Sequence, residues 1–200
     1  MMDATSMPED QMRLFLCLFL QIFVGLFMNT FVTGGPTMRY LFNMLCGVFL
    51  TTYMFRETSH FIFLEALGAY LVMNFFPREK QQYYTVGFVI ACLSSMHARQ
   101  MYLDYGGYKM DVTSYTMILT TKLWGLSWAY HDGGKDTKEL TPEQVNKRVV
   151  KMPSVLEYFS FVYFSLGCMC APFHEYSDFK NWIEFESHYK NLPRGLGGSF

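Results

Sequence analysis

The chain has 200 residues, of which 51% are hydrophobic, 18% aromatic and only 16% charged, against roughly 25% charged residues in an average soluble domain. Its formal net charge is −1, so it lacks the strongly basic field by which proteins attract nucleic acid. The charged residues crowd into short connectors between long uncharged runs. This distribution predicts an integral membrane protein in which several segments cross the bilayer.

The first uncharged run covers residues 14–33, the length needed to cross a hydrocarbon core of about 30 Å. A cleaved signal peptide is the competing interpretation because Arg13 precedes the run, but such peptides have a shorter apolar segment of about 7–15 residues. We therefore predict a retained helix at this position.

Five more apolar runs follow, and they are too continuous for the alternating pattern of barrel strands. The sequence therefore predicts an all-α, multi-span transmembrane bundle of about five to six helices, forming a single transmembrane domain over residues 1–200. A polar loop, residues 131–154, is expected before the last run. The five further predicted spans are residues 40–55, 60–76, 83–97, 113–130 and 155–172.

Several helix starts can be predicted from the capping-box pattern, in which Ser or Thr is followed three residues later by Glu or Gln. The pattern occurs at Ser6 with Glu9, at Thr141 with Gln144, and at Ser154 with Glu157.

Two other helix boundaries follow from single residues. Gly133 or Gly134 suits the left-handed position just past a helix end, after the fifth run. Ser177 is expected to cap a short helix at the membrane interface. The large apolar residues of that helix are Phe179, Trp182, Ile183 and Phe185.

Lys122 is the most informative single residue because it lies in the middle of the fifth run. A central lysine costs about 2.5–3.5 kcal/mol on insertion scales, so it is expected to face the bundle interior or a wet cavity near an acceptor. Two interpretations remain open: a structural pair with the carboxylate of Glu65 or Glu157, or a place in the lining of a substrate or headgroup passage.

Other chemistry is only weakly indicated. His131 and Asp132 could act as a base and the group that orients it, although helix-end turns are rich in such residues. The sequence holds no H-E-x-x-H zinc motif, no P-loop and no nucleophile elbow, and no metal site is expected. The five cysteines fall mostly within the apolar runs, which is typical of small buried hydrophobes.

Around the fifth run the pattern becomes specific. Asp111-x-Thr113-x-x-x-Met117-x-x-Thr120-x-Lys122, followed by Tyr130-His131-Asp132-Gly133, resembles a signature of the membrane-bound O-acyltransferases, in their lysophospholipid acyltransferase branch. Pro153-Ser154-Val155-Leu156-Glu157-Tyr158 is similar to that branch's P-S-L-x-E-Y block. Pro172, Tyr176 and Phe179 fit the element that follows it. These matches keep their order over about seventy residues, whereas the first four runs match in hydropathy alone.

The resemblance implies transfer of a fatty acyl group from acyl-CoA, as co-substrate and with no other cofactor, to the free hydroxyl of a lysophospholipid. It also implies phospholipid remodelling in the endoplasmic reticulum. The family's catalytic histidine and asparagine are expected beyond residue 200, so no residue here is assigned to catalysis. The resemblance further implies a polar chamber lining, for which the candidates are Asp111, Thr113, Lys122, Tyr130 and Asp132.

Two departures from the family pattern bear on packing, since Ser114 and Ala171 stand where glycine is usual. Three interpretations follow. The chain is the N-terminal part of an acyltransferase, inactive alone; or it is a small non-catalytic membrane protein that binds lipid or pairs with a second copy or a full-length relative; or it is a transporter or channel subunit. The ordered motifs favour the first over the third.

Overall fold

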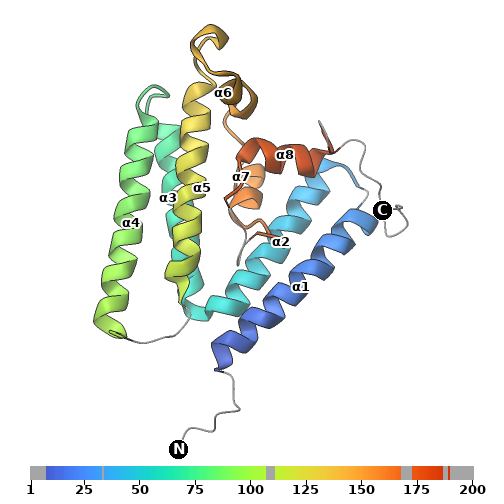
Figure 1. Ribbon diagram of the computed structural model, residues 1–200, viewed down its shortest axis with the longest axis vertical. Helices are drawn as coiled ribbons and strands as arrows, with labels where there is room; N and C mark the ends of the chain where they lie inside the picture. Colours follow the sequence, from blue (N-terminus) through green and yellow to red (C-terminus); the bar gives the residue numbers. More distant parts are fainter. Residues whose placement is uncertain (1–7, 33, 107–110, 168–172, 187–188, 190–200) are drawn as a thin grey trace, which may run out of the picture.

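The computed structural model describes residues 8–32, 34–106, 111–167, 173–186 and 189, and within these ranges the chain is helical and has no strand. The all-α prediction is therefore confirmed over the described residues. Eight α-helices and two short 3₁₀ turns lie in these ranges (Figure 1): α1 Glu9–Phe31, α2 Pro36–Phe55, η1 Arg56–Thr58, α3 Ser59–Phe75, α4 Gln81–Leu103, α5 Val112–Asp132, η2 Thr137–Glu139, α6 Pro142–Lys147, α7 Val155–Val162 and α8 Tyr176–Glu184.

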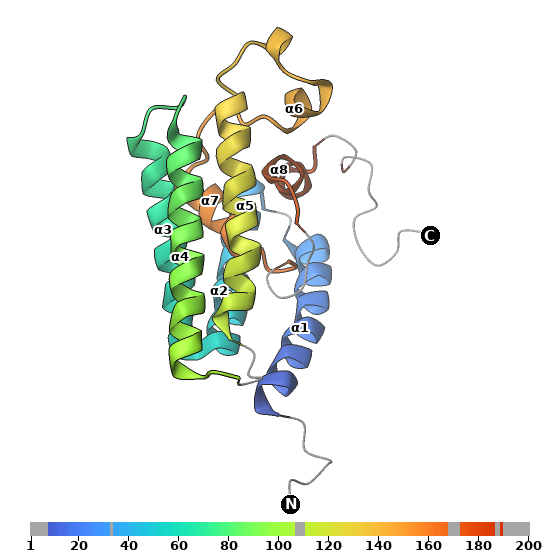
Figure 2. The same cartoon turned by 60° about the vertical axis from the view of Figure 1, so that its left-hand side comes forward.

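The long helices form two groups. Helices α3, α4 and α5 stand side by side, while α1 and α2 lie as a slanted pair (Figures 1 and 2). Because η1 joins α2 to α3 at one end only, the two groups diverge from that corner. The short helix α7 occupies the space between them and packs on α2 and α3. Helix α8 lies across the N-terminal end of α2.

Five of the six apolar runs coincide with long helices, and each of these helices begins before its run. Helix α4 shows why, since it begins at Gln81 and ends at Leu103, although hydropathy indicated residues 83–97. Gln81 is fully buried and its amide donates to the backbone oxygen of Ser127 on α5 at 2.7 Å. A polar residue that is hydrogen-bonded inside the bundle ends an apolar run in the sequence without ending the helix.

The sixth predicted span, residues 155–172, is wrong as a single helix of membrane length. Helix α7 ends at Val162, and the chain then turns over residues 163–167. Eight residues rise about 12 Å, which is far short of a hydrocarbon core of about 30 Å. The contacts that end α7 come from other helices and are described below.

The capping predictions have mixed outcomes. Both reciprocal hydrogen bonds of a capping box are present at Thr141 and at Ser154, which confirms these two starts. Ser6 lies outside the described residues. Ser177 is not a cap, because α8 already begins at Tyr176 and its preceding residue, Glu175, makes no side-chain cap.

The short helix α8 is held against α2 by buried aromatic contacts. The Tyr40 hydroxyl donates to Glu184 at 2.9 Å, and the rings of Tyr40 and Phe179 lie 6.1 Å apart. The Arg39 guanidinium lies 3.6 Å from the centre of the Phe185 ring. The predicted short amphipathic helix therefore exists, and its apolar face packs on the protein.

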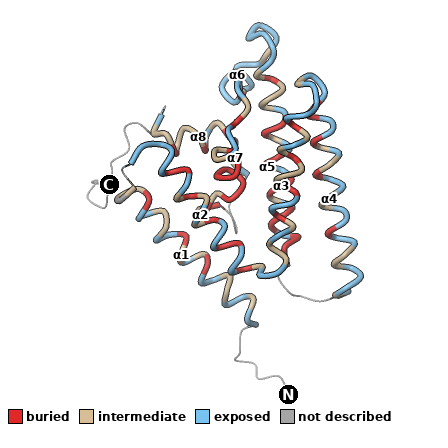
Figure 3. The backbone as a smooth tube through the Cα atoms, turned by 180° about the vertical axis from the view of Figure 1, so that it is seen from behind, coloured by how far each residue is buried: buried red, intermediate tan, exposed pale blue. Residues whose placement is uncertain are grey.

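Burial concentrates where α7 meets α2, α3 and α5, whereas the outer face of α1 is exposed (Figure 3). Among the described residues, α1 is the one helix that is both long and apolar enough to cross a membrane, with a mean hydropathy of 1.8 over its most apolar stretch. Helix α3 has only 17 residues, and α5 carries buried polar residues that lower its hydropathy. The bundle of five to six spans stays a prediction.

Candidate functional site: the buried end of α7

Helix α7 begins at the surface and ends inside the bundle. Its first turn is closed by Ser154, which is exposed, and by Glu157, which accepts from the Ser154 backbone N–H at 2.8 Å. The five residues from Tyr158 to Val162 are all buried. Its last turn is thus enclosed by neighbouring helices, and the final carbonyls of a helix have no partner within the helix itself.

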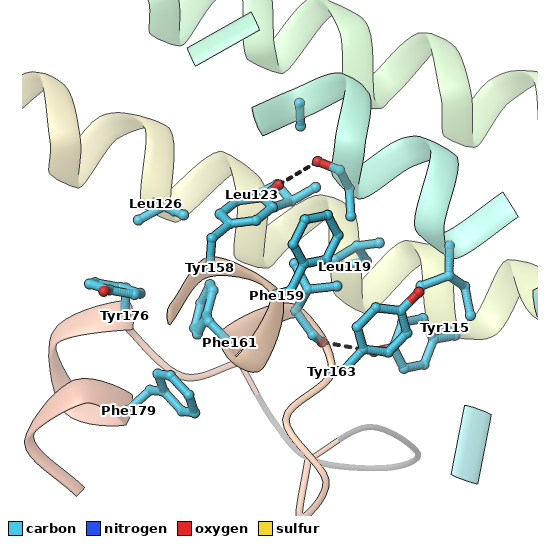
Figure 4. Packing of buried hydrophobic residues seen from close by; sticks show 14 of the residues in the cluster. Tyr115, Leu119, Leu123, Leu126, Tyr158, Phe159, Phe161, Tyr163, Tyr176 and Phe179 are labelled. Carbon is cyan, nitrogen blue, oxygen red and sulfur yellow. Dashed lines mark hydrogen bonds between the residues drawn. The ribbon is translucent and has the colours of Figure 1, made fainter. Parts of the chain in front are cut away.

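Side chains from α2 and α5 satisfy three consecutive carbonyls at this end. The Asn43 amide donates to the Ser160 oxygen at 2.8 Å. The Lys122 ammonium donates to the Phe161 oxygen at 2.6 Å and to the Val162 oxygen at 3.3 Å. The Tyr115 hydroxyl also donates to the Val162 oxygen, at 2.8 Å (Figure 4).

The position of Lys122 confirms that it faces the bundle interior, since only 2% of its surface is exposed. Its acceptors lie at the C-terminal end of a helix, where the backbone dipoles give a partial negative charge. The ammonium also lies 4.7 Å from the centre of the Phe161 ring, a favourable cation–π distance. The two carboxylates considered from the sequence are engaged elsewhere: Glu157 caps α7, and Glu65 accepts from the Thr120 hydroxyl at 3.1 Å.

Asn43 holds the turn that follows α7 as well as the helix end. It is fully buried, and its oxygen accepts from both the backbone N–H and the hydroxyl of Ser165, at 3.1 and 2.9 Å. Neither Asn43 nor Tyr115 was identified from the sequence. An asparagine inside an apolar run is a signal that could have identified Asn43, because burying an amide without partners costs several kcal/mol.

Gly47 of α2 allows α2 and the end of α7 to lie close together. A Cβ atom on Gly47 would lie 1.7 Å from the backbone oxygen of Tyr163, which is an impossible contact. Glycine therefore lets α2 approach the end of α7 closely, as small residues do at helix interfaces in membranes.

The five predicted lining residues lie at three levels of α5 and do not meet. Asp111 caps the start of α5 by accepting from the backbone N–H and the hydroxyl of Thr113. Tyr130 and Asp132 lie at the other end, about 30 Å away at 1.5 Å per residue. Lys122 lies between the two levels. These residues therefore do not form one cluster, and their role in a chamber lining stays a prediction.

The upper end of α5 is joined to the following loop by Arg78. Its guanidinium donates to the backbone oxygens of Tyr130 and Val149, both at 2.8 Å, and lies 4.3 Å from the centre of the Tyr130 ring. Asp132 accepts from the Gln144 amide at 3.1 Å, and His131 contacts the Arg78 oxygen at 3.2 Å. His131 and Asp132 thus each serve a separate contact of the turn.

The prediction of a left-handed glycine at this turn is wrong. Gly133 has a φ of −64°, and neither Gly133 nor Gly134 is among the residues with positive φ. Glycine is required here for space, because a Cβ on Gly133 would lie 2.0 Å from the Val149 oxygen. The departure at Ser114 has no packing consequence, since that residue is exposed, and Ala171 lies outside the described residues.

A surface cavity of about 610 Å³ opens beside the start of α7, between the segment before it and α8. Its basic lining residues are Arg148, Lys151 and Lys180, and Glu157 and Glu186 also line it. On the neighbouring face, Lys147 pairs with Glu175 at 3.2 Å, and this carboxylate raises the pKa of Lys147. With three basic and two acidic lining residues, the cavity carries a small excess of positive charge, next to the block that carries Ser154 and Glu157.

Comparison with known proteins gives matches over nearly the whole chain. Residues 98–197, half of the chain, match the MBOAT, membrane-bound O-acyltransferase family. Membrane-bound glycerophospholipid O-acyltransferase 2 of Mus musculus is 28% identical over 200 residues, covering 98% of this chain and 38% of the mouse protein. The Homo sapiens protein of that name is 27% identical over 192 residues, covering 94% and 37%. Lysophospholipid acyltransferase 6 of Drosophila melanogaster is 27% identical over 202 residues, covering 98% and 27%.

The chain spans less than two fifths of the length of these curated relatives. The matched half contains Tyr115, Lys122 and the whole of α7, so the buried helix end belongs to the segment that the family shares. The resemblance seen in the sequence is confirmed by these comparisons. This chain belongs to the membrane-bound O-acyltransferase family.

Proposed function

We propose that this chain forms part of a membrane O-acyltransferase that moves a fatty acyl group from acyl-CoA to the free hydroxyl of a lysophospholipid. The names of its relatives as glycerophospholipid and lysophospholipid acyltransferases support this reaction class. In the reaction the lysophospholipid oxygen forms an ester bond with the acyl carbonyl, the thioester bond breaks, and coenzyme A leaves as the thiol.

The observation that carries the proposal is the capped end of α7 within the shared family segment. Lys122, Tyr115 and Asn43 fix a short helix that would otherwise expose unpaired carbonyls inside the bundle. A reaction between a thioester and a lipid hydroxyl depends on holding both groups in a defined geometry. We assign these three residues to positioning, and the general base and oxyanion donor to the part of the relatives that this chain does not match.

The cavity beside the start of α7 supports entry of an anionic group. Arg148, Lys151 and Lys180 contribute positive charge there, and both substrates carry phosphate. We assign this cavity to the approach of a substrate headgroup from the membrane surface. Of the five predicted lining residues, Lys122 is the one that the buried helix end supports for an interior role.

A chimera tests the proposal. The aligned segment of the mouse relative is replaced by this chain, and acyl transfer from oleoyl-CoA to lysophospholipids is measured in membranes without endogenous activity. We expect transfer by the chimera and none by the 200-residue chain alone. Lys122→Met in the chimera should lower transfer on the order of tenfold to a hundredfold. Without the ammonium, the end of α7 is no longer held in position, and the substrates are no longer held in a reactive geometry. Lys138→Met, in the exposed turn η2 and away from both the helix end and the cavity, is the control.

An inactive chimera that reaches the membrane in normal amount would contradict the proposal and favour the second candidate, a non-catalytic membrane protein that binds lipid or pairs with another chain. We also propose residence in the endoplasmic reticulum, which fluorescence microscopy of the tagged chain would check.

A further inference from the structure

A second cavity lies in the corner where the two helix groups diverge, beside the end of α7. It has a volume of about 420 Å³, within the roughly 300–1,000 Å³ of small-molecule sites. Its walls come from α2, α3 and the end of α7. The lining includes the apolar side chains of Met44, Val48, Phe63 and Phe159, together with Tyr163.

The wall of this cavity formed by α3 and α7 is apolar. The rings of Phe63 and Phe159 stack with their centres 5.6 Å apart, which joins α3 to α7. The hydroxyls of Thr51 and Ser59 also line the cavity, but each donates to a backbone oxygen of its own helix region, at 2.9 and 2.7 Å. These two donors are therefore already used.

Tyr163 differs from Tyr158 and Tyr115, whose hydroxyls are used inside the bundle. The hydroxyl of Tyr158 donates to the Ala66 oxygen at 2.7 Å, and that of Tyr115 donates to the Val162 oxygen. Only 6% of Tyr163 is exposed, and its hydroxyl makes no hydrogen bond within the part of the chain that the structure describes. The hydroxyl is not one of the fully enclosed polar atoms, and the residue lines the cavity. Figure 4 shows its ring projecting from the end of α7 with the oxygen at the outer end. Buried tyrosine hydroxyls normally have a partner.

The position of Tyr163 is fixed by its backbone. Its oxygen lies so close to Gly47 that no side chain fits between them, and its N–H donates to the Phe159 oxygen at 2.9 Å. The backbone of Tyr163 is thus held at the cavity, and its side chain forms part of the lining. Phe63, which lines the cavity, is about half exposed, and in a membrane protein such a surface meets lipid chains.

We propose that this cavity binds an acyl chain of a membrane glycerophospholipid, with the chain against Val48, Phe63 and Phe159 and its ester oxygen accepting from the Tyr163 hydroxyl. An alkyl chain suits the apolar wall, and an ester carbonyl supplies an acceptor for the Tyr163 hydroxyl. The site does not depend on the acyl-transfer reaction, so it holds whether or not the chimera described above is active.

Photolabelling tests the site. The full 200-residue chain is placed in phosphatidylcholine nanodiscs containing a phosphatidylcholine with a diazirine in its acyl chain, and labelled peptides are mapped by mass spectrometry. We expect saturable labelling of peptides from α2, α3 and α7. Val48→Trp fills the cavity and should lower this labelling about tenfold, whereas Phe49→Trp, on the adjacent exposed face, should leave it unchanged.

Tyr163→Phe keeps the shape of the side chain and removes only the donor, so it tests the hydrogen bond even if Val48→Trp fails to fold. We expect labelling at the cavity to fall about threefold, in line with the loss of one neutral hydrogen bond. Helix content by circular dichroism checks that each variant is folded.

Three results would overturn the proposal. The first is labelling that does not saturate and is equal in the Val48→Trp variant, which would show only lipid around the protein. The second is undiminished labelling of Tyr163→Phe, which would show that the hydroxyl does not hold the lipid. The third is labelling by photoreactive palmitate but not by the phospholipid, which would assign the cavity to free fatty acid.

Discussion

At both ends of α7, backbone groups that have no partner within the helix are satisfied by side chains, but the two ends use side chains from different parts of the chain. At its N-terminus, the free backbone groups are satisfied by Ser154 and Glu157, which are three residues apart. At its C-terminus, the free carbonyls are satisfied by Asn43, Tyr115 and Lys122, which lie 39 to 117 residues away in the sequence. The first end depends on local sequence alone, whereas the second exists only when α2 and α5 are in place. Changes at the C-terminal end should therefore loosen the whole bundle, and changes at the N-terminal end should loosen only one turn.

Gly47→Ala should have the largest effect. The added methyl group would overlap the Tyr163 backbone oxygen, so α2 and α7 must separate, and the free energy of unfolding should fall by about 3 kcal/mol. Unfolding by SDS in dodecyl maltoside micelles, followed by circular dichroism, measures the change. Gly87→Ala is the matched control, because its Cβ would meet no atom within 4 Å. Equal stability of the two variants would contradict the close approach.

Lys122→Met should lower the free energy of unfolding by about 2–3 kcal/mol. The Phe161 oxygen would lose its charged donor, and hydrogen bonds to charged groups are worth about 1.5–3 kcal/mol. Hydrogen exchange should become faster in the last turn of α7 before it does in α4. Exchange that stays slow at α7 would show that the ammonium is not needed there. Lys180→Met, on the half-exposed face of α8, should change neither quantity.

Asn43→Leu should cost about 2 kcal/mol, since the Ser160 oxygen and the Ser165 N–H would both lose their partner inside the bundle. The same SDS titration measures this variant. The matched control is Asn74→Leu, because Asn74 is exposed and its amide donates only within α3. A loss of stability in Asn74→Leu as large as that in Asn43→Leu would show that the hydrogen bonds of Asn43 to α7 are not the cause of the effect.

Ser154→Ala should have the smallest effect, about 1 kcal/mol, through loss of the cap. Hydrogen exchange should become faster only in the first turn of α7, and the last turn should stay protected. Ser177→Ala provides the comparison, because Ser177 lies inside α8 and caps nothing. If Ser154→Ala also exposed the last turn, the two ends of α7 would not be independent.

These contrasts also explain how far the sequence could predict the structure. Hydropathy located the five long helices, and local patterns located the starts of α6 and α7, because each depends on residues close together in the chain. The interior position of Lys122 could be predicted because a charged side chain in the middle of an apolar helix costs free energy when it faces lipid.

What the sequence could not show depends on contacts between distant segments. The end of α7 at Val162 follows from Asn43 and Lys122, whose partners no local pattern identifies. Gly133 was expected to supply a left-handed turn, but its small size serves an approach of the Val149 backbone from the following loop. Ser177 does not cap α8 because the helix already begins at Tyr176, whose side chain is buried in the bundle.

The capped end of α7 also sets an order of events during synthesis. Asn43 is made 117 residues before its partner Ser160, and Lys122 is made 39 residues before Phe161. At about 5–20 residues per second, the ammonium waits roughly 2–8 s, and the amide longer, before the carbonyls that satisfy them have been made. During that interval α2 and α5 each carry a polar group with no acceptor from α7. The emerging α7 is therefore the segment that supplies acceptors to both polar groups, and a chain stalled before residue 160 holds neither of these hydrogen bonds.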